Sequence, residues 1–312
     1  MPVDRETVKL AYQLVLGRDP ESDEVIDLYV DFPNAIELGK HFQDSTEFKD
    51  KQAGAISQSK WVAVDVLDRF VQWVDLHDRN VSYGCLHNSW EASETEYFQS
   101  VLNFGDTVLD IGANIGWFTL VAAKKIGNQG TIHSFEPRPA TLSALKRTIS
   151  DNRLQSCVTV WPHALSDEAS LVDLFWAPNT DNPGGSTFGD ASYRAAGFES
   201  AQVVAVRLDD LLPDIAPDVV KIDVEGAEPK ALKGAVQALA RKHPPILSEL
   251  HATQLKIVSG ITPEEYIAWF GTLGYACYHL QDGRPRDRLH GLPSDSQGGL
   301  ASVVFEWRAG LA

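Results

Sequence analysis

Residues 107–118 of this chain are Thr107-Val108-Leu109-Asp110-Ile111-Gly112-Ala113-Asn114-Ile115-Gly116-Trp117-Phe118. The first five are β-branched or apolar apart from one acid, as in a strand that is buried on both faces. Two glycines four residues apart then break the run, and residues 118–125 form a helical pattern that ends in two lysines. The stretch therefore predicts the first half of a nucleotide-binding βαβ unit, in which backbone N–H groups of the turn approach a ligand closely.

The spacing of this turn indicates which ligand it suits. The order Asp110-x-Gly112-x-Asn114-x-Gly116 differs from the G-x-G-x-x-G of dinucleotide-binding proteins. An acid at the end of the strand suits a cationic or hydroxyl-rich ligand and would repel a pyrophosphate. S-adenosylmethionine carries an ammonium and a sulfonium and no phosphate, so it fits better than NAD. The alternative is an ordinary glycine turn of an α/β protein.

Composition limits the classes of protein to consider. The 312 residues, 44% of them hydrophobic, suffice for one large domain or for one domain and a small one. The net charge of −16 argues against a nucleic-acid partner, which requires clustered Lys and Arg. Three cysteines, Cys85, Cys157 and Cys277, form no C-x-x-C pair and indicate a reducing compartment. With a charged N-terminus and no apolar run near the roughly 20 residues that span a bilayer, we expect a cytoplasmic protein without a membrane partner.

Two domains are expected. Residues 1–55 are predicted to form a small helical module, because Val8, Tyr12, Val15 and Leu16 fall on one helical face. Its Leu-Gly-Arg-Asp-Pro and Ser-Thr-Glu-Phe motifs resemble a bacterial helical module of unassigned function that often accompanies glycosyl- and methyl-transferring enzymes. The small and polar residues 52–59 indicate a linker, and residues 56–312 are expected to form the main domain.

The main domain alternates strand and helix patterns. Residues 61–76 suit either a strand pair or a helix, and residues 80–84 suit a turn. Strands are predicted at 131–135, 158–161, 219–223 and 245–250, and helices at 91–102, 140–152, 228–241 and 266–273. Two antiparallel pairs are predicted, one from 171–176 and 202–208, the other from 275–280 and 302–307. The pattern predicts an α/β fold with a mainly parallel sheet, helices on both faces and an antiparallel C-terminal strand.

Polar residues follow several of these strands, and in such a sheet ligands lie at the carboxyl ends of the strands. Glu136, about twenty residues past the turn, stands where a carboxylate accepts hydrogen bonds from both ribose hydroxyls. The turn of Ala164 to Asp167, which includes Ser166, stands where an adenine edge would be recognised. Asp110 and Asn114 are expected to face the methionine end of the ligand.

Five motifs together carry a family resemblance. They are Val-Leu-Asp-Ile-Gly-Ala-Asn-Ile-Gly, Ser-Phe-Glu-Pro, His-Ala-Leu-Ser-Asp, Gly-Gly-Ser-Thr-Phe and Lys-Ile-Asp-Val-Glu-Gly-Ala-Glu. Residues 80–310 thereby resemble the FkbM family of S-adenosylmethionine-dependent methyltransferases. The resemblance implies a class I methyltransferase (Rossmann-like) fold and O-methylation of a hydroxyl on a sugar or natural product. It also assigns Asp110, Gly112, Asn114 and Gly116 to the methionine-side loop and Glu136 to the ribose, whereas Trp117 replaces a smaller aromatic ring.

A sugar hydroxyl is a poor nucleophile, so a base or a metal ion should assist it. Asp223 is the first candidate for the base, and His251 is the alternative. Asp223 and Glu249 together could hold a hard divalent cation such as Mg²⁺.

The acceptor is expected to be a small molecule. Its binding elements are predicted to be Trp90 and the loop 179–188, with Asn182, Ser186 and Thr187. Other readings stay open: a carboxyl- or N-methyltransferase, a Rossmann-type dehydrogenase, or a protein that binds S-adenosylmethionine without catalysis. The sequence also leaves open whether the protein is a homo-oligomer.

Overall fold

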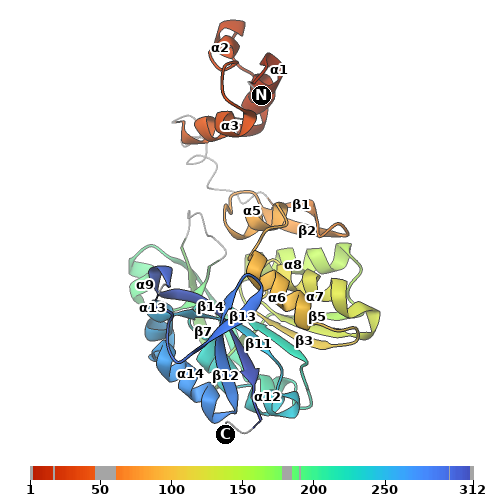
Figure 1. Cartoon of the computed structure of the whole chain (residues 1–312), viewed down its shortest axis with the longest axis vertical. Coiled ribbons are helices and arrows are strands. Elements are labelled where there is room, and N and C mark those ends of the chain that lie inside the picture. The colour runs from red at the N-terminus through yellow and green to blue at the C-terminus, as the bar shows by residue number, and fades with distance from the viewer. Residues whose placement is uncertain are drawn as a thin grey trace. The chain divides into compact units, whose positions relative to one another are not determined.

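The structure is a computed structural model of the 312-residue chain, and it describes residues 3–16, 18–45, 61–177, 185–189, 191–294 and 296–309. The chain divides into two compact units, Met1–Ser59 and Lys60–Ala312, which Figure 1 shows in one view. The predicted linker at 52–59 lies outside the described residues. No helix among the described residues is long and apolar enough to cross a membrane.

The N-terminal unit is helical. It contains α1 (Arg5–Ala11), a π-helical turn (Tyr12–Leu16), α2 (Asp23–Asp27) and α3 (Ala35–Asp44). Asp4 caps α1 by accepting a hydrogen bond from the N–H of Thr7 at 2.8 Å. Apolar side chains from these elements share a small core: Val3, Val8, Tyr12, Leu16, Ile26, Leu38 and Phe42.

The second unit is built on an eight-stranded sheet of order β13-β12-β14-β11-β10-β3-β4-β5. These strands are Arg284–Leu289, Tyr275–Gln281, Leu300–Trp307, Ile246–His251, Val219–Ile222, Thr107–Ile111, Thr131–Phe135 and Val158–Trp161, in the same order. Strands β11, β10, β3, β4 and β5 are parallel, and β14 lies antiparallel between β11 and β12. This arrangement confirms the predicted class I methyltransferase fold.

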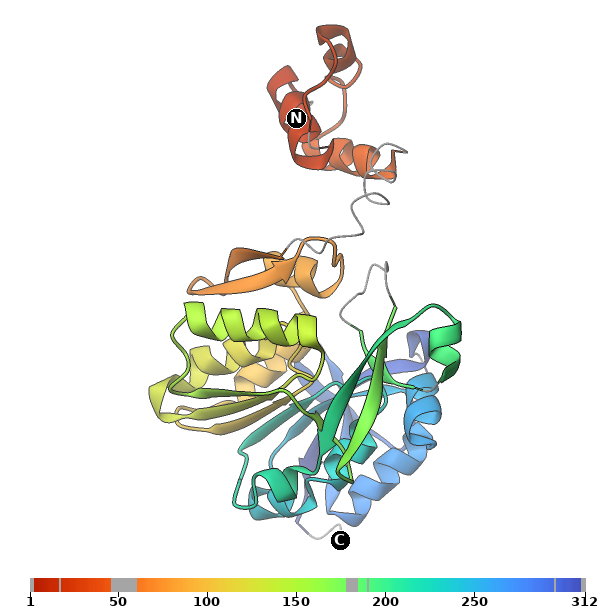
Figure 2. The ribbon, with the colours of Figure 1, turned by 180° about the vertical axis from the view of Figure 1, so that it is seen from behind.

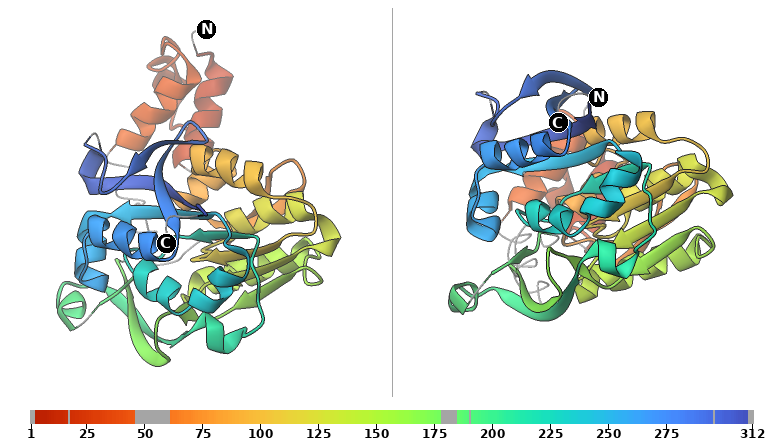
Figure 3. Two further views of the ribbon diagram at one scale, coloured as in Figure 1. Left: turned by 60° about the horizontal axis from the view of Figure 1, so that its bottom comes forward. Right: turned by 90° about the horizontal axis from the view of Figure 1, so that it is seen from below.

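Helices cover both faces of this sheet (Figure 3). The helices that pack on it are α6 (Ala92–Val101), α7 (Trp117–Ile126), α8 (Pro139–Asp151), α11 (Glu228–Lys233), α12 (Val236–Lys242) and α14 (Pro263–Thr272). The neighbouring residues Val108 and Leu109 of β3 belong to different cores: Val108 packs with α6, α7 and α8, and Leu109 with α11, α12 and α14. A strand buried on both faces must be apolar at successive positions, which explains the continuous run in the sequence.

Further helical segments connect these elements. They are α5 (Val81–Leu86), η2 (Gly127–Gln129), α9 (Ala191–Ala195), α10 (Leu208–Leu211), α13 (Ala252–Gln254), η3 (Leu255–Ser259) and η4 (Gln297–Gly299). The predicted turn at residues 80–84 is wrong, because α5 begins there. Asp78 accepts hydrogen bonds from the N–H groups of Val81 and Ser82, at 3.1 and 3.0 Å, and so starts the helix.

Residues 61–76 form a strand pair, β1 (Trp61–Val66) and β2 (Phe70–Asp75). Helix α8 lies between this hairpin and the central sheet (Figure 2). Asn152, just after α8, accepts from the N–H of Val71 at 2.9 Å and donates to its carbonyl at 2.5 Å. Backbone groups of β2 thus find partners on the helix, which satisfies an edge of the hairpin.

A second sheet of order β6-β9-β7-β8 flanks the central one. It consists of Ala164–Leu165, Glu199–Val206, Ser170–Trp176 and Thr187–Phe188. The predicted antiparallel pair is confirmed, because β7 and β9 pair from Ser170 with Ala205 to Trp176 with Glu199.

Two further elements of the structure differ from the prediction. The helix expected at 228–241 is two helices, since Asp209 accepts hydrogen bonds from the N–H groups of Gln237 and Ala238 and so caps a new start. Strand β13 was not predicted. Its sequence Arg-Pro-Arg-Asp-Arg-Leu lacks apolar alternation, as a largely exposed edge strand can.

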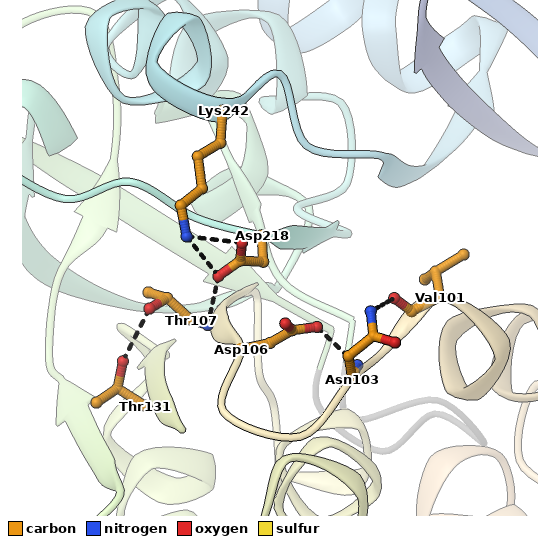
Figure 4. Close-up of polar contacts among 7 residues, drawn as sticks. All are labelled: Val101, Asn103, Asp106, Thr107, Thr131, Asp218 and Lys242. Carbon is orange, nitrogen blue, oxygen red and sulfur yellow. Dashed lines mark hydrogen bonds and ion pairs between the residues drawn. The ribbon is translucent and has the colours of Figure 1, made fainter. Parts of the chain in front are cut away.

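The amino end of β3 is held by a polar cluster at the edge opposite the glycine turn (Figure 4). Asp218 accepts a hydrogen bond from the N–H of Thr107 at 2.9 Å and forms an ion pair with Lys242 at 2.7 Å. Asp106 accepts from the N–H of Asn103 at 2.7 Å. These contacts fix the position of β3, and with it the turn that follows.

Candidate functional site

The glycine turn joins β3 to α7, and its conformation requires glycine. Gly112 has φ +81°, and a Cβ added there would lie 1.9 Å from the carbonyl oxygen of Asp223 at the end of the neighbouring strand β10. Gly116 has φ +96°, and its added Cβ would lie 2.6 Å from Leu145 Cδ1. A side chain at Gly112 would meet backbone and force the turn away from β10, whereas at Gly116 the left-handed φ is the main constraint, because the end of the Leu145 side chain can shift.

Asn114 and Glu136 connect the turn to the end of β4. Asn114 has φ 51°, in the left-handed region, and its N–H donates to Glu136 Oε2 at 2.8 Å. Glu136 Oε1 accepts from the N–H of Arg138 at 2.9 Å and from Thr141 Oγ1 at 2.8 Å. Burial raises the pKa of Glu136, and these three hydrogen bonds oppose that rise.

These contacts limit the number of hydrogen bonds that Glu136 can accept from a ligand. A carboxylate offers about four acceptor positions, and protein donors fill three of them here. One position on Oε2 is left, so Glu136 can accept one ligand hydroxyl in this geometry. The side-chain Oδ1 of Asn114 is buried without a hydrogen-bond partner. Since buried polar atoms are normally paired, it is a second position that suits a ligand donor.

Asp110 lies beneath the turn. It is fully buried, and its Oδ2 accepts from Thr119 Oγ1 at 2.5 Å while Oδ1 has no partner. Burial raises the pKa of Asp110, Lys221 lowers it, and burial prevails. Asp110 is not among the residues that line the neighbouring cavity, so in this geometry it supports the turn from below.

A cavity of about 410 Å³ opens at the carboxyl ends of the parallel strands. The turn residues Gly112 and Asn114, and Glu136 beside them, line it. His163 and Ala164 also line it, next to Phe135, whose ring stacks on Trp161. Ser166 does not: its N–H donates to the carbonyl of Val206, and its hydroxyl contacts Asp167. Within the predicted adenine turn, Ala164 and Leu165 line the cavity, and Ser166 and Asp167 do not.

The other end of the cavity is charged. Lys221 Nζ lies 3.3 Å from Asp223 Oδ2 and 4.7 Å from the centre of the Phe118 ring. Burial lowers the pKa of Lys221, but Asp223, Glu91 and Asp110 outweigh burial and raise it above its usual value. A buried ammonium thus orients the carboxylate that we predicted as the base. Lys221 was missed in the sequence, although a lysine inside the apolar run Val-Val-Lys-Ile was a signal.

Two glutamates join this ion pair from other elements. Burial raises the pKa of Glu91 to about 8, with Lys221 opposing and Asp223 adding to the rise. Burial raises the pKa of Glu249 to about 9, and Asp223 and Glu91 add to it. Both side chains line the cavity. Glu91 was also missed, because its left-handed φ of 42° before α6, which places it here, leaves no sequence pattern.

His251 lines the cavity too, but its Nδ1 accepts a hydrogen bond from the N–H of Gln254 at 3.4 Å, at the start of α13. A neutral imidazole that accepts at Nδ1 carries its proton on Nε2, so in this geometry the ring has no lone pair to serve as a base. The described residues contain no group of three or more His, Cys, Asp or Glu side chains that could hold a metal ion. Lys221 already occupies one side of Asp223, so the pair Asp223 and Glu249 fits a divalent cation poorly.

The structure separates the predicted acceptor residues. Trp90 and Ser186 line the cavity. Thr187 does not, and its hydroxyl donates to the carbonyl of Glu225 at 3.2 Å, which ties β8 to the loop after β10. Asn182 lies outside the described residues. Trp117 is buried and lines the cavity, and its indole N–H donates to Thr95 at 2.9 Å.

Comparison with known proteins gives four curated relatives, of which three are described here. The chain is 30% identical over 175 residues to the 31-O-demethyl-FK506 methyltransferase FkbM of Streptomyces tacrolimicus, covering 47% of this chain and 66% of the relative. It is 33% identical to methyltransferase sdnD of Sordaria araneosa, over 41% of this chain and 59% of the relative. It is 28% identical to the hexuronic acid methyltransferase AglP of Haloferax volcanii, over 47% of this chain and 56% of the relative. The chain thus matches less than two thirds of the length of each.

Among solved structures, methyltransferase FkbM from Methylobacillus flagellatus KT is 15% identical, with a TM-score of 0.38, over 96% of this chain and 58% of that one. The sequence model of the family described as methyltransferase FkbM domain matches residues 110–276 of this chain. That range covers more than half of the chain and contains the glycine turn, Glu136 and the pair Lys221 and Asp223. The protein therefore belongs to the FkbM methyltransferase family.

Proposed function

We propose that this protein is an S-adenosylmethionine-dependent O-methyltransferase that acts on a hydroxyl of a sugar, glycoside or other secondary metabolite. One observation carries the proposal: a single cavity is bounded by the glycine turn with Glu136 and, at its other end, by Asp223 held on Lys221. Family membership supports methyl transfer. The relatives named for an FK506 hydroxyl position and for a hexuronic acid support an oxygen acceptor.

The residues of the turn suit this cofactor. Glu136 has one acceptor position left for a ribose hydroxyl, and the buried Oδ1 of Asn114 can accept from the ammonium of the methionine end. Gly112 lets the backbone approach closely, since it carries no Cβ. When bound, S-adenosylmethionine supplies a methyl group already activated by its sulfonium.

The chain's part in the reaction is to position and deprotonate the acceptor. When the oxygen of an acceptor hydroxyl is methylated in this cavity, Asp223 would take the hydroxyl proton and later pass it to water. Lys221, 3.3 Å away, keeps the carboxylate oriented. Alignment and the exclusion of water from the cavity supply much of the acceleration.

Calorimetric titration of the full chain with S-adenosylmethionine and, separately, with NAD tests the cofactor. We expect binding of S-adenosylmethionine only, weakened by roughly 10- to 100-fold in Glu136→Ala, as for a lost charge-assisted hydrogen bond. Glu168→Ala, at an exposed glutamate of the loop after β6, is the matched control and should bind normally. Binding of NAD would favour the dehydrogenase reading. Binding of neither would contradict the proposal, provided that circular dichroism shows folded protein.

The base is tested by Asp223→Asn. We expect this variant to keep its affinity for S-adenosylmethionine and to lose most methyl transfer, because the side chain keeps its size but no longer accepts a proton. Unchanged transfer would exclude Asp223 as the base and leave Glu249 as the next candidate.

We also infer that residues 1–55 form a separate domain and that the protein is cytoplasmic. Deletion of residues 1–55 should then leave cofactor affinity unchanged.

A further inference from the structure

Carboxyl groups outnumber cations at the end of the cavity that holds Lys221 and Asp223. Four carboxyl groups line this end, from Glu91, Asp223, Glu225 and Glu249. Among the described lining residues Lys221 is the single Lys or Arg, and its Nζ pairs with Asp223 at 3.3 Å. Residues 178–184, whose placement is not described, contain neither Lys nor Arg in their sequence. The charge of Lys221 is thus matched by Asp223, and the other carboxyl groups have no cation of their own in this described lining.

Glu91 and Glu249 reach this end from separate elements. Glu249 lies in β11 directly opposite Ser302 of β14, so the two side chains stand on the same face of the sheet. The hydroxyl of Ser302 donates to the carboxylate of Glu94 in the first turn of α6. This contact holds the start of α6, and with it Glu91, which just precedes the helix, on the side of Glu249.

Both carboxyl groups are mostly protonated at neutral pH. Burial raises the pKa of Glu91 to about 8, with Lys221 opposing the rise and Asp223 adding to it. Burial raises the pKa of Glu249 to about 9, and Asp223 and Glu91 add to that rise. The other acids that face the pair act in the same direction, namely Glu94 and Asp110 on Glu91, and Glu225 and Glu228 on Glu249. The ring of His251 beside them accepts a backbone N–H at Nδ1 and is neutral in this geometry. The pair therefore holds protons that a nearby positive charge would displace.

S-adenosylmethionine would bring such a charge. Its sulfonium gives it a net charge of about +1 at neutral pH, whereas its product S-adenosylhomocysteine has no sulfonium and is close to neutral. For methyl transfer the sulfonium must lie within a methyl group's reach of an acceptor at Asp223, and therefore near Glu91 and Glu249. A unit positive charge roughly 6–8 Å away lowers the pKa of a carboxyl group by roughly 1.5–2 at the effective dielectric of buried sites. At about pH 7.5 that is enough for the pair to lose about one proton.

We propose that Glu91 and Glu249 act as one proton-releasing pair, which ionises when S-adenosylmethionine binds and stays protonated when S-adenosylhomocysteine binds. The inference rests on the proposed methyl transfer and adds a property to it: the pair favours the charged cofactor over its neutral product. When an acceptor hydroxyl is methylated, that hydroxyl loses one proton, which balances the proton that the pair takes back. Glu91 precedes the family-matched residues 110–276, so part of this response comes from outside them.

The experiment counts protons by calorimetric titration of the full chain at pH 7.5. The heat of binding is measured in buffers of different ionisation enthalpy, and its slope against that enthalpy gives the number of protons released. The amino group of the ligand also titrates near this pH, so each ligand is compared between the wild type and the double variant Glu91→Gln, Glu249→Gln. With S-adenosylmethionine we expect the wild type to release roughly 0.5–1 proton more than the double variant, and with S-adenosylhomocysteine an equal number.

The pH dependence of affinity is a second readout. Proton release on binding makes affinity rise with pH. Between about pH 6.5 and 8.5, the wild type should therefore gain affinity for S-adenosylmethionine by roughly 3- to 10-fold more per pH unit than the double variant. Affinity for S-adenosylhomocysteine should follow the same pH dependence in both proteins. Glu96→Gln makes the same chemical change at an exposed position of α6 outside the cavity, and it should match the wild type in both readouts.

The outcomes separate this inference from the proposed function. Equal proton release by the wild type and the double variant with S-adenosylmethionine would overturn the inference and leave methyl transfer intact. The same excess release with S-adenosylhomocysteine would also overturn it, because the sulfonium would then not be the cause. No binding of S-adenosylmethionine to folded wild type would overturn both. If the double variant does not bind S-adenosylhomocysteine, the single variants Glu91→Gln and Glu249→Gln replace it, and unchanged release in both of them would overturn the inference.

Discussion

Replacing Gly112 by alanine tests the closest backbone approach in the candidate site. The added Cβ would lie 1.9 Å from the carbonyl oxygen and 3.0 Å from the carbonyl carbon of Asp223. Both atoms belong to the backbone, so no side-chain rotation can relieve the overlap. The turn and the end of β10 must move apart, and this movement would disturb Asp223 and the cofactor cradle together.

The magnitude follows from a matched control. Gly105 has φ +87° and nothing within 4 Å of an added Cβ, whereas Gly112 has φ +81° and the overlap. A left-handed alanine costs roughly 1–2 kcal/mol, partly offset by the roughly 0.4–1 kcal/mol that alanine removes from the entropy of the unfolded chain. Both variants share these effects. Gly112→Ala adds an overpacking cost of about 1–3 kcal/mol, which is the expected difference between them.

The assay is urea unfolding followed by tryptophan fluorescence. All 8 tryptophans of the chain lie after residue 60, so the signal reports on the second unit alone. Gly112→Ala should unfold at lower urea than Gly105→Ala and should also bind S-adenosylmethionine more weakly. If the two variants lose equal stability, the close approach of the turn to Asp223 does not constrain this position, and the reasoning is refuted.

Other expected outcomes use the same unfolding assay. Asp218→Asn should lower the free energy of unfolding by about 0.5–1 kcal/mol at low salt. The loss should be smaller at 1 M salt, because the ion pair between Asp218 and Lys242 is partly exposed. The control Asp214→Asn, at an exposed residue four positions earlier in the chain, should leave the free energy of unfolding unchanged. Folding raises the pKa of Glu249 from its usual 4.5 to about 9. The protonated side chain therefore stabilises the folded protein fully below about pH 4.5, and this stabilisation is lost as the pH rises to about 9. Stability should therefore fall between pH 6 and 9, and less steeply in Glu249→Gln; equal slopes would contradict the raised pKa. Asn152→Ala should cost about 1–3 kcal/mol, because it leaves backbone groups of Val71 without partners, and an unchanged midpoint would show that the hairpin does not depend on this contact.

Much of the fold could be predicted because its signals are local. The run from Thr107 to Ile111 is β-branched or apolar at every position except Asp110, and the structure buries it on both faces as β3. The helix pair α11 and α12 was predicted as one helix, since the cap that separates them, Asp209, lies far away in sequence. Strand β13 could not be recognised, because its pairing with β12 places charged residues at an exposed sheet edge.

The sequence by itself determined the alternation of strands and helices, the glycine turn and the set of acids at the strand ends, since each depends on neighbours within a few residues. Only the tertiary structure decided how those acids are used. In the structure, protein donors fill three acceptor positions of the Glu136 carboxylate, the Thr187 hydroxyl donates to a backbone carbonyl, and Lys221 forms an ion pair with Asp223. It also brought Glu91 into the cavity from a segment outside the family-matched residues. Such contacts join residues far apart in the chain, and they depend on burial and backbone direction, which no local pattern records.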